Sequence, residues 1–488
     1  MNLYLIGHDY RYAAEQMLLT LFPDERPEYP DGRPTGDRAE LRLMSGTKVT
    51  TVTCVLVYHG QTANGRTSVP NGELTDPAEK DRRLQGAVKR AFYRAAMGIG
   101  LPHRPWGMLT GVRPGKLMTP LLAQGLNDAQ AARQFERQYD VSPARADLVV
   151  RTAHATLRAM ESLGEKDVCL YVGIPFCPTR CAYCSFVSQS VEKSMALVPE
   201  FLQALAREIA ATAEAVRRVG LRVVSLYIGG GTPTTLSARQ LDALCTQLAA
   251  AFDLSALREF TVEAGRPDTI TADKLQVLRA HRVDRISVNP QTLDDRVLDT
   301  IGRRHTAQDI YDALRLVRET GGFAVNMDLI AGLPGDTPDG FRATLEQVLA
   351  LAPENITVHT LSRKRGSNLM AQDAPIPDGA AVGEMLDFAG TVLPRAGYAP
   401  YYLYRQKFMS GGFENVGWTR PGQENLYNIC IMEELCSILA MGGGASTKLV
   451  RPNGGRLERH IDPKYPTEYI ANIDRICAAK AELEAFFQ

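Results

Sequence analysis

The sequence lacks an excess of charge of either sign. Lysine plus arginine number 55 and aspartate plus glutamate number 55, so the formal net charge is zero. A nucleic-acid-binding domain usually carries a basic excess, and this composition therefore disfavours nucleic acid as a partner. With 45% hydrophobic and 23% charged residues, the chain has the composition of a soluble globular protein.

Long apolar runs are also missing. No run reaches the ~18 residues that a membrane-spanning helix needs. The opening stretch "MNLYLIGHDYRYAAEQ" meets His8, Asp9, Arg11 and Glu15 soon after a short apolar run, so it lacks the long apolar region of a signal peptide. We therefore expect no membrane span and a cytoplasmic protein.

Cysteine is sparse outside one segment. In a reducing compartment, isolated cysteines in apolar contexts usually behave as small buried hydrophobic residues. Six cysteines fit that description: Cys54, Cys169, Cys245, Cys430, Cys436 and Cys477. The other three lie within eight residues of one another, in the segment "VGIPFCPTRCAYCSF" at 172–186, and need another explanation.

The length of 488 residues predicts two or three domains, one of them a barrel. Residues 1–160 offer strands at 3–7, 40–44 and 48–60 and a helix at 82–100, which predicts an N-terminal α+β domain. The final segment, 396–488, predicts a small C-terminal domain that covers the open side of the barrel.

The central region, 161–395, alternates strand-length apolar runs with amphipathic helices such as 198–220 and 337–352. Successive βα units predict a parallel sheet, either doubly wound or a partial (β/α)6 barrel of the TIM type. Both architectures place ligands at the carboxyl ends of the strands. The predicted strands are 168–174, 223–231, 259–265, 285–291, 324–334 and 356–362.

Cys177, Cys181 and Cys184 follow the first of these strands in a CxxxCxxC spacing, on a loop restricted by Pro175 and Pro178. Structural zinc requires four closed ligands, and the absence of a fourth cysteine or suitably spaced histidine nearby disfavours zinc. An iron–sulfur cluster held by three thiolates would leave one iron open to a ligand from outside the protein.

This motif resembles the radical S-adenosylmethionine (SAM) superfamily. The resemblance implies a [4Fe–4S] cluster held by the three cysteines, with an open fourth iron that binds SAM and cleaves it reductively. The next strand ends in "YIGGGTPTTL", which resembles the glycine motif that contacts SAM in this superfamily. The stretch "GGGTPT" within it resembles the coproporphyrinogen oxidase branch.

Polar residues also end the later strands, and residues at one rim of successive βα units form one site. The whole pattern resembles the oxygen-independent coproporphyrinogen III oxidase family, and "PWGMLTGVRPGKL" with "YYLYRQKFMSGGFENVGW" resembles its HemZ-type subgroup. The resemblance implies one or two bound SAM molecules. The residues expected to contact the first SAM molecule are Tyr171, Gly230 and Glu263. Those expected to line the position of the second SAM molecule are Tyr183, Gly231, Thr232, Gln291, Arg303 and Asp328, with Ser362 and Ser446 as weaker matches.

The same resemblance implies an anaerobic oxidative decarboxylation of two coproporphyrinogen III propionates to vinyl groups, with a reductant such as flavodoxin or ferredoxin as partner. The negatively charged propionates of this substrate need cationic partners, and the planar guanidinium of arginine can donate two hydrogen bonds to one carboxylate. Arg363 and Arg405 are the candidates by position, whereas His359 is expected to be a core histidine rather than a haem ligand.

One residue departs from the oxidase pattern. The characterised oxidase continues its motif as CxxxCxxCxC, whereas this chain has Phe186 at the last position, as in the haem-chaperone branch. Cluster and SAM chemistry need only three thiolates, so the departure affects the substrate alone. A haem-binding chaperone and a radical SAM enzyme that acts on another substrate, such as RNA, therefore remain alternatives.

Overall fold

The computed structural model describes residues 1–32, 34–184, 189–190, 194–362, 375–406, 410–451 and 457–487. The chain divides into two compact units, one made of residues 1–112 and 125–147 and the other of residues 113–124 and 148–488. Each unit has its own sheet. The three-part division drawn from the sequence stays a prediction.

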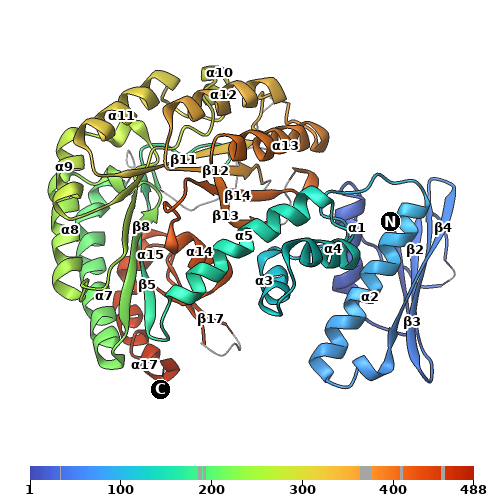
Figure 1. The fold of residues 1–488 in the computed structure, drawn as a ribbon. Helices are drawn as coiled ribbons and strands as arrows, with labels where there is room; N and C mark the ends of the chain where they lie inside the picture. The colour runs from blue at the N-terminus through green and yellow to red at the C-terminus, as the bar shows by residue number, and fades with distance from the viewer. Residues whose placement is uncertain are drawn as a thin grey trace. The chain divides into compact units, whose positions relative to one another are not determined.

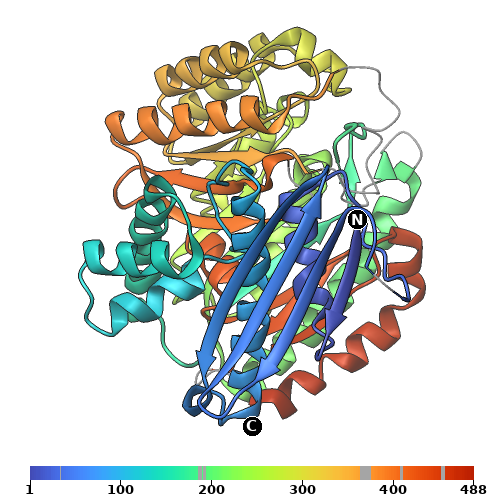
Figure 2. The ribbon, with the colours of Figure 1, turned by 90° about the vertical axis from the view of Figure 1, so that its right-hand side faces the viewer.

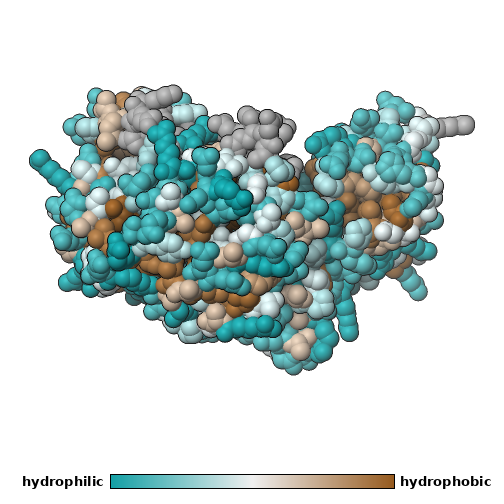
Figure 3. Space-filling view, turned by 90° about the horizontal axis from the view of Figure 1, so that it is seen from above, coloured by the Kyte–Doolittle hydropathy of each residue, from teal (hydrophilic) through white to brown (hydrophobic). Residues whose placement is uncertain are grey.

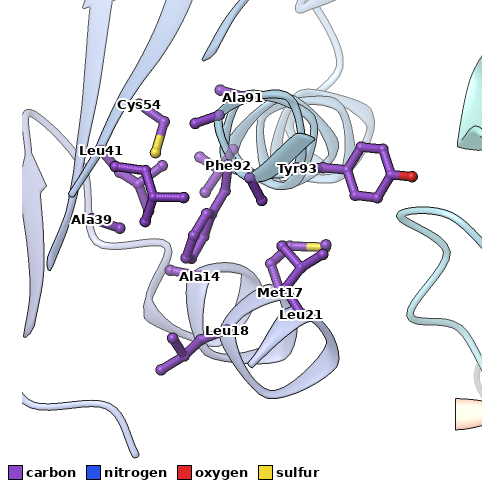
Figure 4. Close-up of a cluster of buried hydrophobic side chains, with 14 of the residues drawn as sticks. Ala14, Met17, Leu18, Leu21, Ala39, Leu41, Cys54, Ala91, Phe92 and Tyr93 are labelled. Carbon is purple, nitrogen blue, oxygen red and sulfur yellow. The ribbon is translucent and has the colours of Figure 1, made fainter. Parts of the chain in front are cut away.

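The first unit is a four-stranded sheet, in the order β1-β2-β3-β4, with helices on one face (Figure 2). Its elements are β1 (Asn2–Ile6), α1 (Arg11–Leu21), β2 (Arg38–Ser45), β3 (Val49–Tyr58), β4 (Gln61–Pro70), α2 (Pro77–Gly98) and α4 (Asp128–Tyr139). Leu41 and Cys54 from the sheet face Phe92 of α2 and Leu18 of α1 in a buried apolar core (Figure 4).

The sequence does not predict β4, because "QTANGRTSVP" carries few apolar residues. Its backbone nevertheless pairs with β3 along the whole strand, from Gln61 opposite Tyr58 to Pro70 opposite Val49. The turn between them uses left-handed backbone at His59 and Gly60. A Cβ at Gly65 would lie 1.9 Å from the carbonyl oxygen of Ala91, so this glycine allows α2 to pack directly on the strand.

The second unit contains an eleven-stranded sheet in the order β13-β14-β12-β11-β10-β9-β8-β5-β15-β16-β17. Neighbouring strands from β12 to β15 in this order are parallel. The strands are β5 (Asp167–Ile174), β8 (Arg222–Gly230), β9 (Glu259–Glu263), β10 (Arg285–Ser287), β11 (Ala324–Ala331), β12 (Asn355–Thr360), β13 (Ala399–Arg405), β14 (Glu414–Thr419), β15 (Ser437–Gly442), β16 (Ser446–Leu449) and β17 (Glu458–Ile461).

Helices follow the parallel strands and line the outer side of the sheet (Figure 1). They are α7 (Val198–Val219), α8 (Ala238–Ala251), α9 (Ala272–Ala280), α10 (Asp295–Thr300), α11 (Ala307–Thr320), α12 (Pro338–Leu351) and α13 (Gly379–Arg395). Further helices of this unit in the described residues are α3 (Gly115–Ala123), α14 (Leu426–Glu433), α15 (Pro466–Ala471), α16 (Ile473–Ala479) and α17 (Glu482–Phe487), while α5 (Pro143–Ser162) leads into β5. The predicted α/β fold, with successive βα units forming a parallel sheet, is confirmed.

Residues 396–488, for which the sequence predicts a covering domain, contribute strands to this same sheet. β14 pairs with β12 in antiparallel orientation, and β15 pairs with β5 in parallel orientation. The C-terminal segment therefore extends the barrel sheet at both of its edges.

Nearly all of the isolated cysteines are buried, as predicted. Cys477 is only partly buried, because the buried face of the short helix α16 consists of Ile473 and Ile476. None of the nine cysteines, all of which lie in the described residues, forms a disulfide.

In the described part of the chain, no helix is long and apolar enough to cross a membrane. On the face seen in Figure 3, hydrophilic side chains predominate and hydrophobic ones lie among them.

Candidate functional site

The candidate site lies at the carboxyl ends of the parallel strands, where the cysteine loop leaves β5 beside the glycine motif of β8. The register pairs Gly173 with Gly229 and Ile174 with Gly230. Beyond the strands, the Gly231 amide donates to the Ile174 carbonyl at 2.8 Å, and the Thr232 amide donates to the Phe176 carbonyl at 2.7 Å. The glycine motif is thereby held against the start of the cysteine loop.

Side chains would not fit at two of these glycines. Gly230 has φ +114°, and a Cβ there would lie 2.9 Å from the backbone of Ile174. A Cβ at Gly231 would lie 2.5 Å from the Phe176 oxygen and 2.9 Å from Cys177 Sγ. The missing Cβ atoms allow the two loops to approach, and Thr232 Oγ1 lies 3.5 Å from the same sulfur.

Two buried arginines hold the other side of the cysteine loop. Arg303 donates to the Tyr183 hydroxyl at 3.1 and 3.3 Å and to the carbonyls of Gly265 at 3.3 Å and Asn289 at 2.9 Å. It therefore links the loop to the ends of β9 and β10. Tyr183 and Arg303, which the sequence placed at one position, are in direct contact.

The second arginine, Arg266, was missed from the sequence. It is only 4% exposed and donates to Thr179 of the cysteine loop at 2.9 Å. Its other donors form a bidentate pair with Asp268. Its position directly after "VEAG", at a strand end, was the available signal.

Glu263 ends β9 beside the glycine motif. A Cβ at Gly229 would lie 2.9 Å from Glu263 Oε2, so the carboxyl group faces the glycine backbone. The Tyr227 hydroxyl donates to Oε1 at 2.5 Å. Burial, reinforced by the charge of Asp328 and only partly offset by the Tyr227 hydrogen bond, raises the pKa of Glu263 to about 7. The group is thus poised to gain a negative charge when a cation approaches.

Three tyrosines stack beside this carboxyl group. The ring of Tyr227 lies 4.4 Å from that of Tyr427 and 6.1 Å from that of Tyr171, and all three are nearly parallel. Burial and the charge of Glu263 raise the pKa of Tyr171, so this hydroxyl stays neutral. Tyr227 and Tyr427 were missed from the sequence, because their roles arise from the packing of α14 on the sheet.

Asp328 on β11 lies in a polar network across the same rim. Asn289 donates to its Oδ2 and Asn326 to its Oδ1, each at 2.8 Å. His359 Nε2 lies 3.8 Å from Oδ2, and its Nδ1 lies 3.5 Å from the Tyr404 hydroxyl. Burial opposes ionisation of Asp328, but the contacts with His359, Asn326 and Thr357 hold its pKa below the usual value.

Gln291 is buried in a left-handed conformation, with φ +67°. Its amide donates to the Asp328 carbonyl at 2.8 Å and its carbonyl accepts from Ile330 at 3.0 Å, and these bonds hold the backbone in place. Its side-chain Oε1 is buried and has no hydrogen-bond partner among the described residues. A non-glycine residue in this conformation stores strain of about 1–3 kcal/mol, which is typical of functional sites.

The remaining predicted residues lie farther along the chain. The Arg405 guanidinium donates to the Gly412 carbonyl at 2.6 and 3.2 Å, and burial lowers its pKa to about 10. Ser446 begins β16, after a glycine turn in which a Cβ at Gly443 would lie 2.6 Å from Pro175 of the cysteine loop. Ser362 follows β12. Arg363 and Phe186 lie outside the described residues.

The sulfur atoms of Cys169, Cys430 and Cys436 form a second group, all within 4.8 Å of one another. Hydrogen bonds from Cys169 and Cys430 lower the pKa of Cys436. The sequence did not bring these cysteines together, since Cys169 and Cys436 are 267 positions apart. They lie on β5, on α14 and just before β15, and not in the CxxxCxxC loop.

The sequence profile of the Radical SAM superfamily matches residues 171–348. The oxygen-independent coproporphyrinogen-III oxidase-like protein HemZ of Bacillus subtilis is 39% identical over 389 residues, 78% of each chain. The heme chaperone HemW of Lactococcus lactis is 29% identical over 66% of this chain and 80% of its own. Among solved structures, coproporphyrinogen III oxidase (HemN) from Escherichia coli aligns with a TM-score of 0.50 and 25% identity, over 66% of this chain and 72% of that one.

Proposed function

Because the chain belongs to the HemZ-type branch of the radical SAM superfamily, which uses a [4Fe–4S] cluster and SAM, we propose that it is an enzyme of anaerobic porphyrin synthesis. Its reaction would be the oxidative decarboxylation of two propionates of coproporphyrinogen III to vinyl groups, giving protoporphyrinogen IX. The observation that carries this proposal is the 39% identity to HemZ over 78% of both chains.

Cys177, Cys181 and Cys184 would hold the cluster. Their thiols have the soft donor chemistry that iron–sulfur clusters require. The local backbone fits as well, because a Cβ at Gly231 would lie 2.9 Å from Cys177 Sγ, and the glycine avoids this close contact. When bound, the cluster and SAM together supply reductive sulfonium cleavage and a carbon radical.

Tyr171, Gly230 and Glu263 would bind the catalytic SAM. The ammonium group of SAM needs an anionic partner, and the partly buried Glu263 carboxyl beside Gly229 provides one. The stacked tyrosines would exclude water around that ion pair and so strengthen it. A flavodoxin or ferredoxin is the class of reductant that such a site would need.

A second SAM position would be lined by Tyr183, Gly231, Thr232, Gln291, Arg303 and Asp328, with Ser362 and Ser446 at its margin. The buried Oε1 of Gln291 supports this assignment, because an unpartnered acceptor is costly unless a ligand donates to it. Arg303 would act by positioning, since its donors already bind Tyr183 and two backbone carbonyls.

Each decarboxylation would transfer a hydrogen atom from the β-carbon of a propionate to the carbon radical, and would then release carbon dioxide and pass one electron to an external one-electron acceptor. The protein would contribute orientation, exclusion of water and counter-charge. Arg363 and Arg405 would pair with substrate carboxylates.

A second candidate function is haem binding, which the likeness to HemW supports. Phe186, in place of the fourth motif cysteine of the oxidase, supports it too. Under this alternative the protein would bind haem and would not decarboxylate coproporphyrinogen.

The deciding experiment incubates the anaerobically reconstituted protein with SAM, dithionite and coproporphyrinogen III. Formation of 5′-deoxyadenosine together with protoporphyrinogen is expected. Stoichiometric haem binding without turnover would favour the chaperone function, and deoxyadenosine without a porphyrin product would point to another substrate. A Cys181→Ala variant should lose the cluster chromophore and SAM cleavage, whereas the matched Cys245→Ala variant, changed in the buried face of α8, should retain both.

A further inference from the structure

The thiol triad of Cys169, Cys430 and Cys436 is buried in an apolar environment inside the larger unit. The three residues are 0%, 0% and 7% exposed, and they pack with Val224, Tyr427 and Ile438. Cys169 is on β5, Cys430 is on α14, and Cys436 directly precedes β15. The triad therefore joins three elements that are distant in sequence.

The triad is separate from the cysteine loop. Cys169 lies five residues before Ile174, where β5 ends, which corresponds to roughly 16 Å along a strand. Cys169 and Tyr171 are two residues apart and so lie on the same face of β5. The triad thus lies below the tyrosine stack, on the side away from the glycine motif.

The geometry is that of a three-sulfur metal site. Metal–thiolate bonds of about 2.3 Å place the sulfurs of a trigonal site about 4.0 Å apart. Cys169 Sγ and Cys436 Sγ are 3.6 Å apart, and all three sulfurs lie within 4.8 Å of one another. Shifts of less than about 1 Å in the sulfur–sulfur distances would complete the coordination.

We propose that this triad binds a single thiophilic monovalent ion of the copper(I) class in trigonal coordination. Thiolates select soft ions such as copper(I), and structural zinc requires a fourth ligand. Among the described residues, no further histidine, cysteine, aspartate or glutamate completes this group. The ion would hold β5, α14 and β15 together beneath the SAM site.

The test uses the full-length chain with Cys177, Cys181 and Cys184 changed to alanine, so that the loop offers no competing thiolates. The protein is titrated anaerobically with copper(I) in competition with a chromophoric chelator. One equivalent should bind, and X-ray absorption should show three sulfur ligands. Adding Cys436→Ser should weaken binding roughly 100-fold, whereas adding the matched Cys245→Ser should leave it unchanged.

Several outcomes would overturn the proposal. These are no retained copper, equal affinity in the Cys436→Ser protein, zinc bound in preference with a fourth ligand, or a Cys169–Cys436 disulfide in freshly purified protein. If Cys436→Ser does not fold, the absorption spectrum of the loop variant still decides, because a site with fewer than three sulfur ligands contradicts the assignment.

Discussion

The proposed pairing of Glu263 with the ammonium group of SAM predicts that SAM binding depends on pH, and the structure supplies the magnitude. In the absence of ligand, burial and the charge of Asp328 raise its pKa to about 7. The carboxyl group is therefore protonated below that pH and ionised above it. If the ionised form pairs with the SAM ammonium group, acidification must weaken binding.

The size of the effect follows from the ionised fraction. For a pKa of about 7, roughly one tenth of the groups are ionised at pH 6 and nine tenths at pH 8. The α-amino group of SAM begins to lose its own proton near pH 8, which offsets part of this change, so the affinity for SAM should fall about fourfold between pH 8 and pH 6. In the Glu263→Gln variant the affinity should be lower at pH 8 and nearly independent of pH.

The same pKa also sets a stability effect of opposite sign. A carboxyl group whose pKa is raised from 4.5 to about 7 destabilises the ligand-free fold above pH 7, and this cost disappears as the pH falls toward the unfolded value. At pH 8 the cost amounts to at most about 3 kcal/mol. Glu263→Gln should therefore stabilise the ligand-free protein at pH 8 while weakening SAM binding.

Both effects can be measured on anaerobic protein, by calorimetric titration with SAM from pH 6 to 8 and by chemical denaturation at pH 8. Asp336 provides a matched control, because burial raises its pKa to about 6, in the same window. Asp336→Asn should keep the pH dependence of SAM affinity. A wild-type affinity that does not change between pH 6 and 8, or a pH dependence that persists in Glu263→Gln, would refute the reasoning.

Two further predictions concern packing and buried charge. Gly231→Ala should lower the iron and sulfide content of reconstituted protein to less than half, because the new Cβ would lie 2.5 Å from the Phe176 oxygen. The control Gly390→Ala, on α13 with no atom within 4 Å of the new Cβ, should stabilise the chain by about 0.5–1 kcal/mol. Equal cluster content in the two variants would contradict the prediction for Gly231. Lys480→Met should lower the free energy of unfolding by about 3–5 kcal/mol, measured by chemical denaturation, because it leaves the fully buried Glu208 carboxylate without its ion-pair partner at 2.6 Å. Adding Glu208→Gln should recover part of the lost stability. If the effects of the two substitutions simply add in the double variant, the pairing is refuted.

The order of the barrel elements could be predicted from the sequence because each element is encoded locally. Strands such as 168–174 and 223–231 read as continuous apolar runs, since a parallel sheet is buried on both faces. Residues 437–442, "SILAMG", carry the same signal and form β15 beside β5. The strand signal of residues 437–442 is therefore present in the sequence. Because these residues follow the sixth βα unit, in a segment expected to form a covering domain, the sequence did not predict that they pair with β5.

Part of the candidate site could also be predicted locally, since the cysteines and glycines lie on short loops at strand ends. Its supporting residues could not. Arg266 and Asn289 contact the site only because β9 and β10 end at the same edge, and Tyr427 reaches Tyr227 only when α14 packs on the sheet.

The sequence by itself determined the strands and helices of the barrel from β5 to β12 and the spacing of the cysteine motif, because hydrophobic period and loop spacing act over a few residues. Only the tertiary structure decided which side chains meet. Glu263 obtains its raised pKa from burial and from Asp328 on another strand, and the thiol triad joins residues 267 positions apart. Burial, charge pairing and sulfur convergence depend on distances in space, and a linear pattern does not contain them.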